Sequence, residues 1–441
     1  MKDGRVVIIG GDAAGMSAAA KIRRQQPERD ILVFEKTLFT SYSACGIPYF
    51  IGGLIDDFTN LIARTPETFR NEYGIDIRTG HEVVNIDSTG CRVRIRDKQN
   101  DREFTEAYDQ LLIATGADPF CPGLPGVTTR GVFGLSTLAS GKRVHDFIQA
   151  ESPRRAVIIG GGYIGLEMAE ALTRLEMQVS LIQRSPQVMD TLDPDMGALV
   201  SDALRKIGVN LYLEEDFEAI ETVNGKVKAA VSNKRILPAD IVILGMGTRP
   251  NSRLAAEAGI ELGIKDSIRV DGRMRTSTPG IWAAGDCAAT VHRVSGQEVH
   301  IALGTIANKQ GVVAGTNLAG GQAWFSGVVG TAVSKICDVE VARTGLQEKE
   351  LNALGVDYAT ATIEASTRAG YFPGAGKITV KMLGDKQNGR LLGAQIVGME
   401  GAAKRIDVVA TALTAGMTVA DIIDLDLSYA PPFSAVWIGS W

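Results

Sequence analysis

Two glycine-rich turns, about 150 residues apart, constrain the fold of this chain more than any other feature. The runs "RVVIIGGDAAGMSAAAKIRR" and "RRAVIIGGGYIGLEMAEAL" each read as a buried strand, a glycine turn and an Ala-rich helix. In a βαβ nucleotide-binding unit the first glycine permits the tight turn. The second lets the backbone approach a pyrophosphate, and the third allows close packing of helix on strand. The two turns therefore predict two dinucleotide sites.

The two turns match the GxGxxG pattern to different degrees. The first has two of the glycines, with Asp12 in the middle position, and the second has all three. The glycines are Gly10 and Gly15, then Gly160, Gly162 and Gly165. Glu35 ends the next strand-like run, "ILVFEK", twenty residues after Gly15, a spacing suited to a ribose hydroxyl. A strand-turn-helix unit that binds nothing is the alternative for either turn alone, but the pair together with Glu35 favours binding.

The remainder of the chain predicts a third domain. After about residue 322 the pattern changes to separate strand-like and helix-like runs, such as "KITVKML" and "RLLGAQIVG". We therefore expect an α/β protein with two Rossmann-like domains and a C-terminal α+β domain.

Composition excludes several classes of function. The 441 residues carry a net charge of −5 with Lys and Arg scattered, so no nucleic-acid surface is expected. No apolar run reaches the ~18 residues of a membrane span, and "MKDG" leads directly into a strand without a signal-peptide pattern, so we expect a cytoplasmic protein without a membrane partner. The five cysteines are far apart and lack metal-ligand spacing, which argues against a disulfide framework and a metal site.

Together these features resemble the pyridine nucleotide-disulfide oxidoreductases, in the single-cysteine branch of coenzyme A-disulfide reductases, NADH oxidases and persulfide reductases. The resemblance is carried by "GGDAAGMSAA", "SYSACGIPYF", "LLIATGADP", "GGGYIGLEMAEAL", "GIWAAGDCA" and "YAPPF". It implies an FAD-binding domain in two parts (1–118 and 248–322), an NAD(P)H-binding domain (119–247) and a C-terminal dimerisation domain (323–441) that forms a homodimer.

The same resemblance implies the cofactor-binding residues. For FAD they are Gly10, Asp12, Ala13, Gly15, Glu35, Lys36, Ala114, Thr115, Gly116, Gly285 and Asp286. For NADPH or NADH they are Gly160, Gly162, Tyr163, Ile164, Gly165, Glu167, Gln183, Arg184 and Gly247. Glu35 would hold the adenosine ribose of FAD, and Asp286 would reach its ribityl and pyrophosphate region.

Cys45 is the expected redox-active residue. Two-cysteine relatives have a CxxxxC pair, but position 50 here is Phe50, so Cys45 would react alone with a sulfur from outside the chain. An inert buried thiol is the alternative. We expect that inert role for the other cysteines, Cys91, Cys121, Cys287 and Cys337.

A proton donor for the departing thiolate is expected from tyrosine. The four histidines all precede the last 141 residues, where two-cysteine relatives keep their base. Tyr429 in "SYAPPF" and Tyr371 in "AGYFPGA" match tyrosines that coenzyme A-disulfide reductases bring to the partner subunit's flavin. The alternative is that both tyrosines only pack.

Similarity to the coenzyme A-disulfide reductases narrows the choice of substrate. Ser17, Lys21, Arg24 and Ser41 match positions that contact coenzyme A, while Asn308 stands where a reductase can have a substrate histidine. "KIRR" can equally be a solvated helix face. Ala13 replaces the histidine of the oxidases and peroxidases, which argues against peroxide chemistry. Coenzyme A disulfide is therefore the first choice. A persulfide or polysulfide reductase, an NADH oxidase and a non-enzymatic NAD(P)H-binding redox sensor stay open.

Two residues after "VSLI" bear on the choice between NADPH and NADH. Gln183 stands where an NAD-selective site would place an acid, and Arg184 can pair with a 2′-phosphate. We expect NADPH to be used at least as well as NADH. The alternative is that Arg184 points to solvent.

Overall fold

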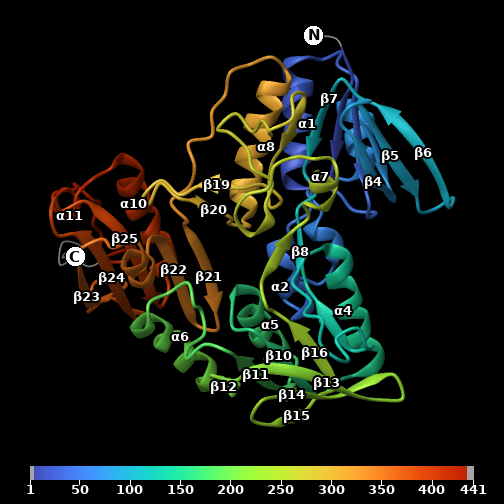
Figure 1. Ribbon diagram of the computed structural model, residues 1–441. Coiled ribbons are helices and arrows are strands. Elements are labelled where there is room, and N and C mark those ends of the chain that lie inside the picture. Colours follow the sequence, from blue (N-terminus) through green and yellow to red (C-terminus); the bar gives the residue numbers. More distant parts are fainter. Residues whose placement is uncertain (1–3, 435–441) are drawn as a thin grey trace.

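The computed structural model describes residues 4–434 and arranges them in three regions, each built on a sheet (Figure 1). Residues 1–3 and 435–441 lie outside the described part of the chain. They include the expected start of the first domain and the expected end of the last. Within residues 4–434, none of the helices combines the length and apolar character that crossing a bilayer requires.

The first region is a parallel sheet with the order β18-β7-β1-β2-β3. Its strands are β1 (Val6–Ile9), β2 (Ile31–Glu35), β3 (Asp76–Thr79), β7 (Gln110–Ile113) and β18 (Ile281–Ala283). A three-stranded antiparallel sheet covers one side, formed by β4 (His81–Asp87), β5 (Arg92–Asp97) and β6 (Arg102–Ala107). Because β18 comes from residue 281, the chain leaves this region and returns to it.

Two helices pack closely on each other beside this sheet, α1 (Ala13–Gln25) and α8 (Gly304–Leu318) (Figure 1). α1 is rich in Ala and buries a face that includes Ala14, Ala18 and Ile22. A Cβ at Gly311 of α8 would lie 2.3 Å from the backbone oxygen of Ala14, so only glycine permits this approach. Shorter elements of this region are α2 (Ile47–Ile51), α3 (Pro66–Tyr73), α7 (Arg253–Glu257), β19 (Thr290–Val291), β20 (Glu298–Val299) and the 3-10 turns η1 (Ala44–Gly46), η2 (Phe58–Leu61) and η3 (Ile264–Asp266).

The second region repeats the parallel design with the order β12-β11-β10-β16-β9. The strands are β9 (Val132–Gly134), β10 (Arg155–Ile159), β11 (Gln178–Gln183), β12 (Asn210–Leu213) and β16 (Ile241–Leu244), with helices α4 (Leu138–Glu151), α5 (Tyr163–Arg174) and α6 (Pro194–Lys206). An antiparallel sheet of β13 (Phe217–Val223), β14 (Lys226–Ser232) and β15 (Ile236–Pro238) covers it. β8 (Ala117–Pro119) and β17 (Thr248–Pro250) pair where the chain enters and leaves this region.

The third region is an antiparallel sheet with the order β21-β22-β25-β24-β23. It comprises β21 (Ala332–Ile336), β22 (Val339–Gly345), β23 (Tyr358–Ser366), β24 (Lys377–Asp385) and β25 (Leu391–Gly398), with α9 (Glu348–Leu354), α10 (Ala402–Ala415) and α11 (Val419–Ile423). Apolar residues of α10, such as Ile406 and Val409, form a core with Val380 and Ile396 of the sheet. The expected fold class, two Rossmann-like domains and an α+β domain, is confirmed. The residue limits of the expected domains stay predictions.

Candidate active site

The carboxyl ends of β1, β2, β7 and β18 surround a cleft of ≈ 320 Å³. Gly10 follows β1 with a φ of 113°, and a Cβ there would lie 2.1 Å from the carbonyl oxygen of Ala114. Glu35 is only 8% exposed, and its carboxylate accepts hydrogen bonds from the backbone N–H groups of Gly11 (2.8 Å) and Thr37 (2.7 Å). The tight turn and the inward carboxylate fit a dinucleotide, because the remaining carboxylate lone pairs can accept ribose hydroxyls.

Most residues expected to hold FAD meet in this cleft. Those that line it are Gly10, Asp12, Glu35, Lys36, Ala114, Thr115, Gly116 and Asp286. Ala13 and Gly15 lie in the first turn of α1, and Gly285 directly precedes Asp286.

Asp12 joins the glycine turn to the segment that carries the cysteine. Its carboxylate accepts the backbone N–H of Tyr42 (3.2 Å), and the N–H of Ser41 donates to the carbonyl of Gly11 (3.1 Å). Burial raises the pKa of Asp12 to about 7, with the charge of Glu35 adding to the effect and the N–H of Tyr42 opposing it. Asp12 therefore changes its charge close to neutral pH.

Cys45 lies exposed in η1, which runs directly into α2. Ile47 and Phe50 of α2 are buried against the second region, and the Phe50 ring stacks on His145 with 4.6 Å between ring centroids. Phe50 is therefore a packing residue at the position of a second cysteine. All five cysteines of the chain are free, so Cys45 has no thiol partner within one subunit.

Burial and two carboxylates raise the pKa of Cys45. Partial removal of water by the surrounding protein raises the pKa of the Cys45 thiol, and the charges of Glu167 and Asp286 raise it further. Burial also raises the pKa of Glu167, whose carboxylate accepts a hydrogen bond from the hydroxyl of Ser334 (2.7 Å) on β21. Glu167 thus connects the surroundings of Cys45 with β21 of the third region.

The second parallel sheet has its own cleft, of ≈ 410 Å³, at its carboxyl edge. Gln183 ends β11, and its side-chain oxygen accepts the backbone N–H of Gly161 (2.9 Å). Arg184 is exposed beside it. Of the residues expected to hold NAD(P)H, those that line this cleft are Gly160, Gly162, Gln183, Arg184 and Gly247. Gly165 and Glu167 lie within α5, and Tyr163 and Ile164 at its start pack against the neighbouring hydrophobic core.

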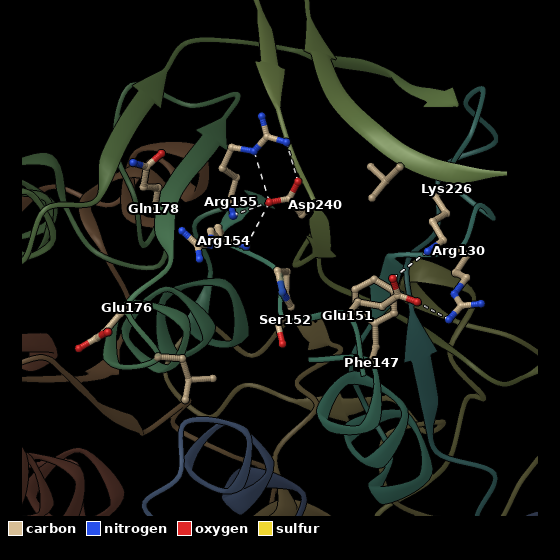
Figure 2. A pocket seen from close by; sticks show the side chains of 13 residues that line it. Arg130, Phe147, Glu151, Ser152, Arg154, Arg155, Glu176, Gln178, Lys226 and Asp240 are labelled. Atoms are coloured by element: carbon tan, nitrogen blue, oxygen red, sulfur yellow. Dashed lines mark hydrogen bonds and ion pairs between the residues drawn. The ribbon is translucent and has the colours of Figure 1, made fainter. Parts of the chain in front are cut away.

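A larger hollow, of ≈ 950 Å³, lies at the opposite, amino edge of this sheet (Figure 2). Two ion-pair groups occupy it. Glu151 binds Arg130 and Lys226 (2.8 Å), and Asp240 binds Arg155. Because these acids are already neutralised and the glycine turn lies at the other edge, this hollow is a salt-bridged surface separate from the nucleotide cleft.

The residues expected to contact substrate lie along α1 and α8. Ser17 donates a hydrogen bond to the side-chain oxygen of Asn308 (2.7 Å), which joins the two helices. Lys21 and Arg24 follow Ser17 on α1 at helical spacing, so their side chains share one face. Ser41 adopts a left-handed conformation (φ 44°) at the edge of the FAD cleft.

The structure brings the two expected tyrosines together but keeps them apart from Cys45 within one subunit. The side-chain hydrogen bond between Tyr429 and Tyr371 raises the pKa of Tyr429, and both side chains are exposed. They belong to the third region, whereas Cys45 precedes α2 in the first; β21 and β22 lie between α2 and α11 (Figure 1). A shared site requires the tyrosines of another subunit.

Sequence reasoning missed three polar groups at these clefts. Asp190 lines the second cleft, Ser334 binds Glu167, and His300 contacts the backbone oxygen of Asp286 through Nε2 (2.7 Å). None lies in a motif, and each is brought in by a long loop or by another region.

Comparisons with known proteins place these features in one family. Residues 4–311 match the pyridine nucleotide-disulphide oxidoreductase model, and residues 331–438 match the dimerisation domain of the same family. The chain belongs to the pyridine nucleotide-disulfide oxidoreductases. As in that family, it is an FAD-dependent oxidoreductase that uses NAD(P)H, which confirms the expected enzyme class and cofactors.

Several relatives match over nearly the whole chain. An NAD(P)H coenzyme A polysulfide/persulfide reductase of Pyrococcus horikoshii is 41% identical, covering 98% of this chain and 96% of the relative. A coenzyme A disulfide reductase of Staphylococcus aureus is 32% identical, with coverages of 98% and 96%. The solved structure of an NAD-dependent persulfide reductase from A. fulgidus is 40% identical with a TM-score of 0.95, covering 98% of this chain and 80% of that one. These names match the branch that the motifs indicated.

Proposed function

We propose that this oxidoreductase reduces the S–S bond of a small coenzyme A derivative, with Cys45 as its only redox-active thiol. The observation that carries the proposal is that Cys45 is exposed at the start of α2 and has no second thiol in the chain with which to form a disulfide. Its redox partner must come from the substrate.

Cys45 would react with the disulfide in two half-reactions. The Cys45 thiolate attacks one sulfur of the disulfide RS–SR, a Cys45–S–SR bond forms, and RS⁻ leaves and takes a proton. When bound, FAD would supply the electron pair, taken from NAD(P)H, for reduction of this mixed disulfide; the second RS⁻ would leave and the Cys45 thiolate would return. Each cycle consumes one NAD(P)H and one proton and yields two thiols.

Coenzyme A is supported by the surface beside the cleft. Lys21 and Arg24 present two cations on the face of α1 that also carries Ser17, and Asn308 bonds to that serine. Cations and hydroxyl groups suit the phosphates of coenzyme A. We place these side chains and Ser41 in the substrate site.

A persulfide or polysulfide of coenzyme A is the second candidate. It is favoured by the 41% identity to a relative named for that activity, against 32% for one named for the disulfide. The Cys45 thiolate would attack the outer sulfur of the persulfide, coenzyme A would leave as its thiolate, and two-electron reduction of the resulting Cys45 persulfide would release HS⁻. Turnover with coenzyme A disulfide and with coenzyme A persulfide, compared at equal concentration, separates the two.

Intact-mass spectrometry of the purified protein tests the proposal. We expect one small-thiol adduct that disappears in Cys45→Ser, together with loss of disulfide turnover and retention of FAD. Retained turnover in Cys45→Ser would exclude the mechanism, and the mass of the adduct identifies the thiol. Cys121→Ser, another exposed cysteine, is the matched control and should change neither readout.

NADPH remains our expected electron donor alongside NADH. Arg184 is exposed at the nucleotide cleft, where it can pair with a 2′-phosphate. Comparison of kcat/KM for the two nucleotides tests this expectation. A preference for NADH above tenfold, about 1.4 kcal/mol, would contradict it.

A further inference from the structure

A carboxylate that belongs to no motif enters the adenosine end of the nucleotide cleft. Asp190 lies in the segment between β11 and α6, seven residues beyond the end of β11. Its Oδ2 accepts hydrogen bonds from the hydroxyl of Ser185 (2.6 Å) and from the side-chain amide of Gln183 (3.1 Å). An acid is thus in direct contact with the strand-end residue.

That place is where the 2′-position of the adenosine ribose is recognised. In a Rossmann unit, the residue at the end of the second strand contacts the ribose, and an acid there favours NAD. Here that residue is Gln183, whose side-chain oxygen is taken by the N–H of Gly161 and whose amide nitrogen faces Asp190. Asp190 therefore supplies the negative charge that the strand itself lacks.

The position of Asp190 is held from two sides. The N–H of Met189 donates to the carbonyl of Gly161 in the glycine turn (2.8 Å). The third region contributes Lys349, whose Nζ donates to the Asp190 carbonyl, and Arg343, which donates to the carbonyl of Thr191 (3.0 Å). These contacts fix the carboxylate at the cleft before any nucleotide arrives.

Other charged side chains also lie at this end of the cleft. Glu215 is paired with Arg235 (2.8 Å), and Asp216 is exposed. Across the described residues no ion pair is found for the exposed Arg184 side chain. A 2′-phosphate would therefore meet the cation of Arg184 and the carboxylates of Asp190 and Asp216, with Lys349 hydrogen-bonded to the Asp190 carbonyl.

We propose that Asp190 is a determinant of nucleotide selectivity: it weakens binding of the 2′-phosphate of NADPH and so limits the preference for NADPH that Arg184 favours. Its charge repels the phosphate, and its hydrogen bonds occupy the Ser185 hydroxyl and the Gln183 amide, the donors that a phosphate would need. Arg184 acts in the opposite sense. The inference rests on NAD(P)H binding in this cleft.

Binding of nucleotide fragments to the FAD-loaded enzyme tests the inference without turnover. Adenosine 2′,5′-bisphosphate and 5′-AMP, which differ only by the 2′-phosphate, are titrated by calorimetry. In Asp190→Asn, which keeps an acceptor oxygen, we expect about tenfold tighter binding of the bisphosphate and an AMP affinity within about twofold of wild type. Asp190→Ser, which also lacks the charge, should raise the affinity for the bisphosphate relative to that for AMP in the same way.

Two further variants control for charge and location. Asp202→Asn removes one negative charge from an exposed position on α6 and should change neither affinity. Arg184→Gln should weaken the bisphosphate selectively. An unchanged ratio of the two affinities in both Asp190 variants would overturn the inference while leaving the proposed function intact. Failure of wild type to bind either fragment would instead refute the nucleotide site itself.

Discussion

Cys45 is surrounded by charges that disfavour its reactive form. Partial burial raises the pKa of the thiol, and the carboxylates of Glu167 and Asp286 raise it further, so only a fraction is thiolate at neutral pH in the isolated chain. Activity that depends on this thiolate should increase as the pH rises toward the pKa. Burial contributes most to the raised pKa, and the carboxylate of Glu167 adds to it.

Replacing Glu167 by Gln should make Cys45 more reactive. Loss of the negative charge lowers the thiol pKa, so alkylation of Cys45 by iodoacetamide at pH 7 should become several-fold faster and its pH profile should move to lower pH. Glu170→Gln is the matched control, because Glu170 lies on the same helix but does not perturb the Cys45 pKa. Equal profiles for wild type and Glu167→Gln would contradict this account.

Asp12 should make FAD affinity depend on pH. Its pKa of about 7 means that the carboxyl is neutral below that pH, and a pyrophosphate at the glycine turn would keep it neutral. FAD affinity should therefore be constant below pH 7 and fall by up to about tenfold per unit above it. Fluorescence titration of the FAD-free protein with FAD measures this. Asp12→Asn should flatten the profile, whereas Asp118→Asn, at the exposed rim of the cleft, should leave it as in wild type.

At the scale of elements, one polar cluster around the buried Lys381 joins the start of α6 to the sheet of the third region. Lys381 of β24, whose side chain is 4% exposed, lies 3.3 Å from Asp193 and 2.8 Å from Asp195. Gln395 of β25 also binds Asp193, by its amide (2.7 Å) and by accepting the Asp193 N–H (2.7 Å). The segment that carries Asp190 therefore depends on a neighbouring domain for its shape.

Lys381→Met should destabilise the protein by about 3–5 kcal/mol, because it leaves the Asp193 carboxylate buried without its cation. Denaturant unfolding followed by fluorescence gives the difference in the free energy of unfolding. Lys386→Met, which removes a mostly exposed ion pair with Asp357, should cost below about 1 kcal/mol. Similar losses in both variants would show that burial of the ion pair does not matter.

The same cluster illustrates which parts of the site the sequence predicts. The glycine turns, Glu35 and Cys45 could be located from the sequence as candidates because each lies in a short local pattern of strand, turn and helix. The roles of Asp190 and Asp193 could not, because they depend on contacts such as that between Asp193 and Gln395, 202 residues apart. Phe50 was recognised as replacing a cysteine, but its stacking on His145 needed the three-dimensional structure.

At the scale of the whole molecule, the expected tyrosines and Cys45 belong to different regions of the chain. Tyr371 and Tyr429 are exposed together on the third region, whereas Cys45 precedes α2 in the first region. A phenol has an ordinary pKa near ~10, and the hydrogen bond to Tyr371 raises that of Tyr429, so it remains a neutral donor at pH 7. We propose that Tyr429 protonates the thiolate RS⁻ that leaves when Cys45 of the partner subunit attacks the disulfide. Tyr371 would lie beside it.

Mixed dimers test this arrangement. Cys45→Ser and Tyr429→Phe homodimers should each lose most activity, the second by about 10²- to 10⁴-fold, because a proton donor is removed. If the tyrosine acts across the interface, a heterodimer of the two has one site with both lesions and one with neither, so tagged and purified heterodimers should recover about half of wild-type activity. If the tyrosine acts within its own chain, each site keeps one lesion and no activity returns. The second result would refute the shared site, because both mutant chains are present in equal amounts and only the pairing of lesions differs.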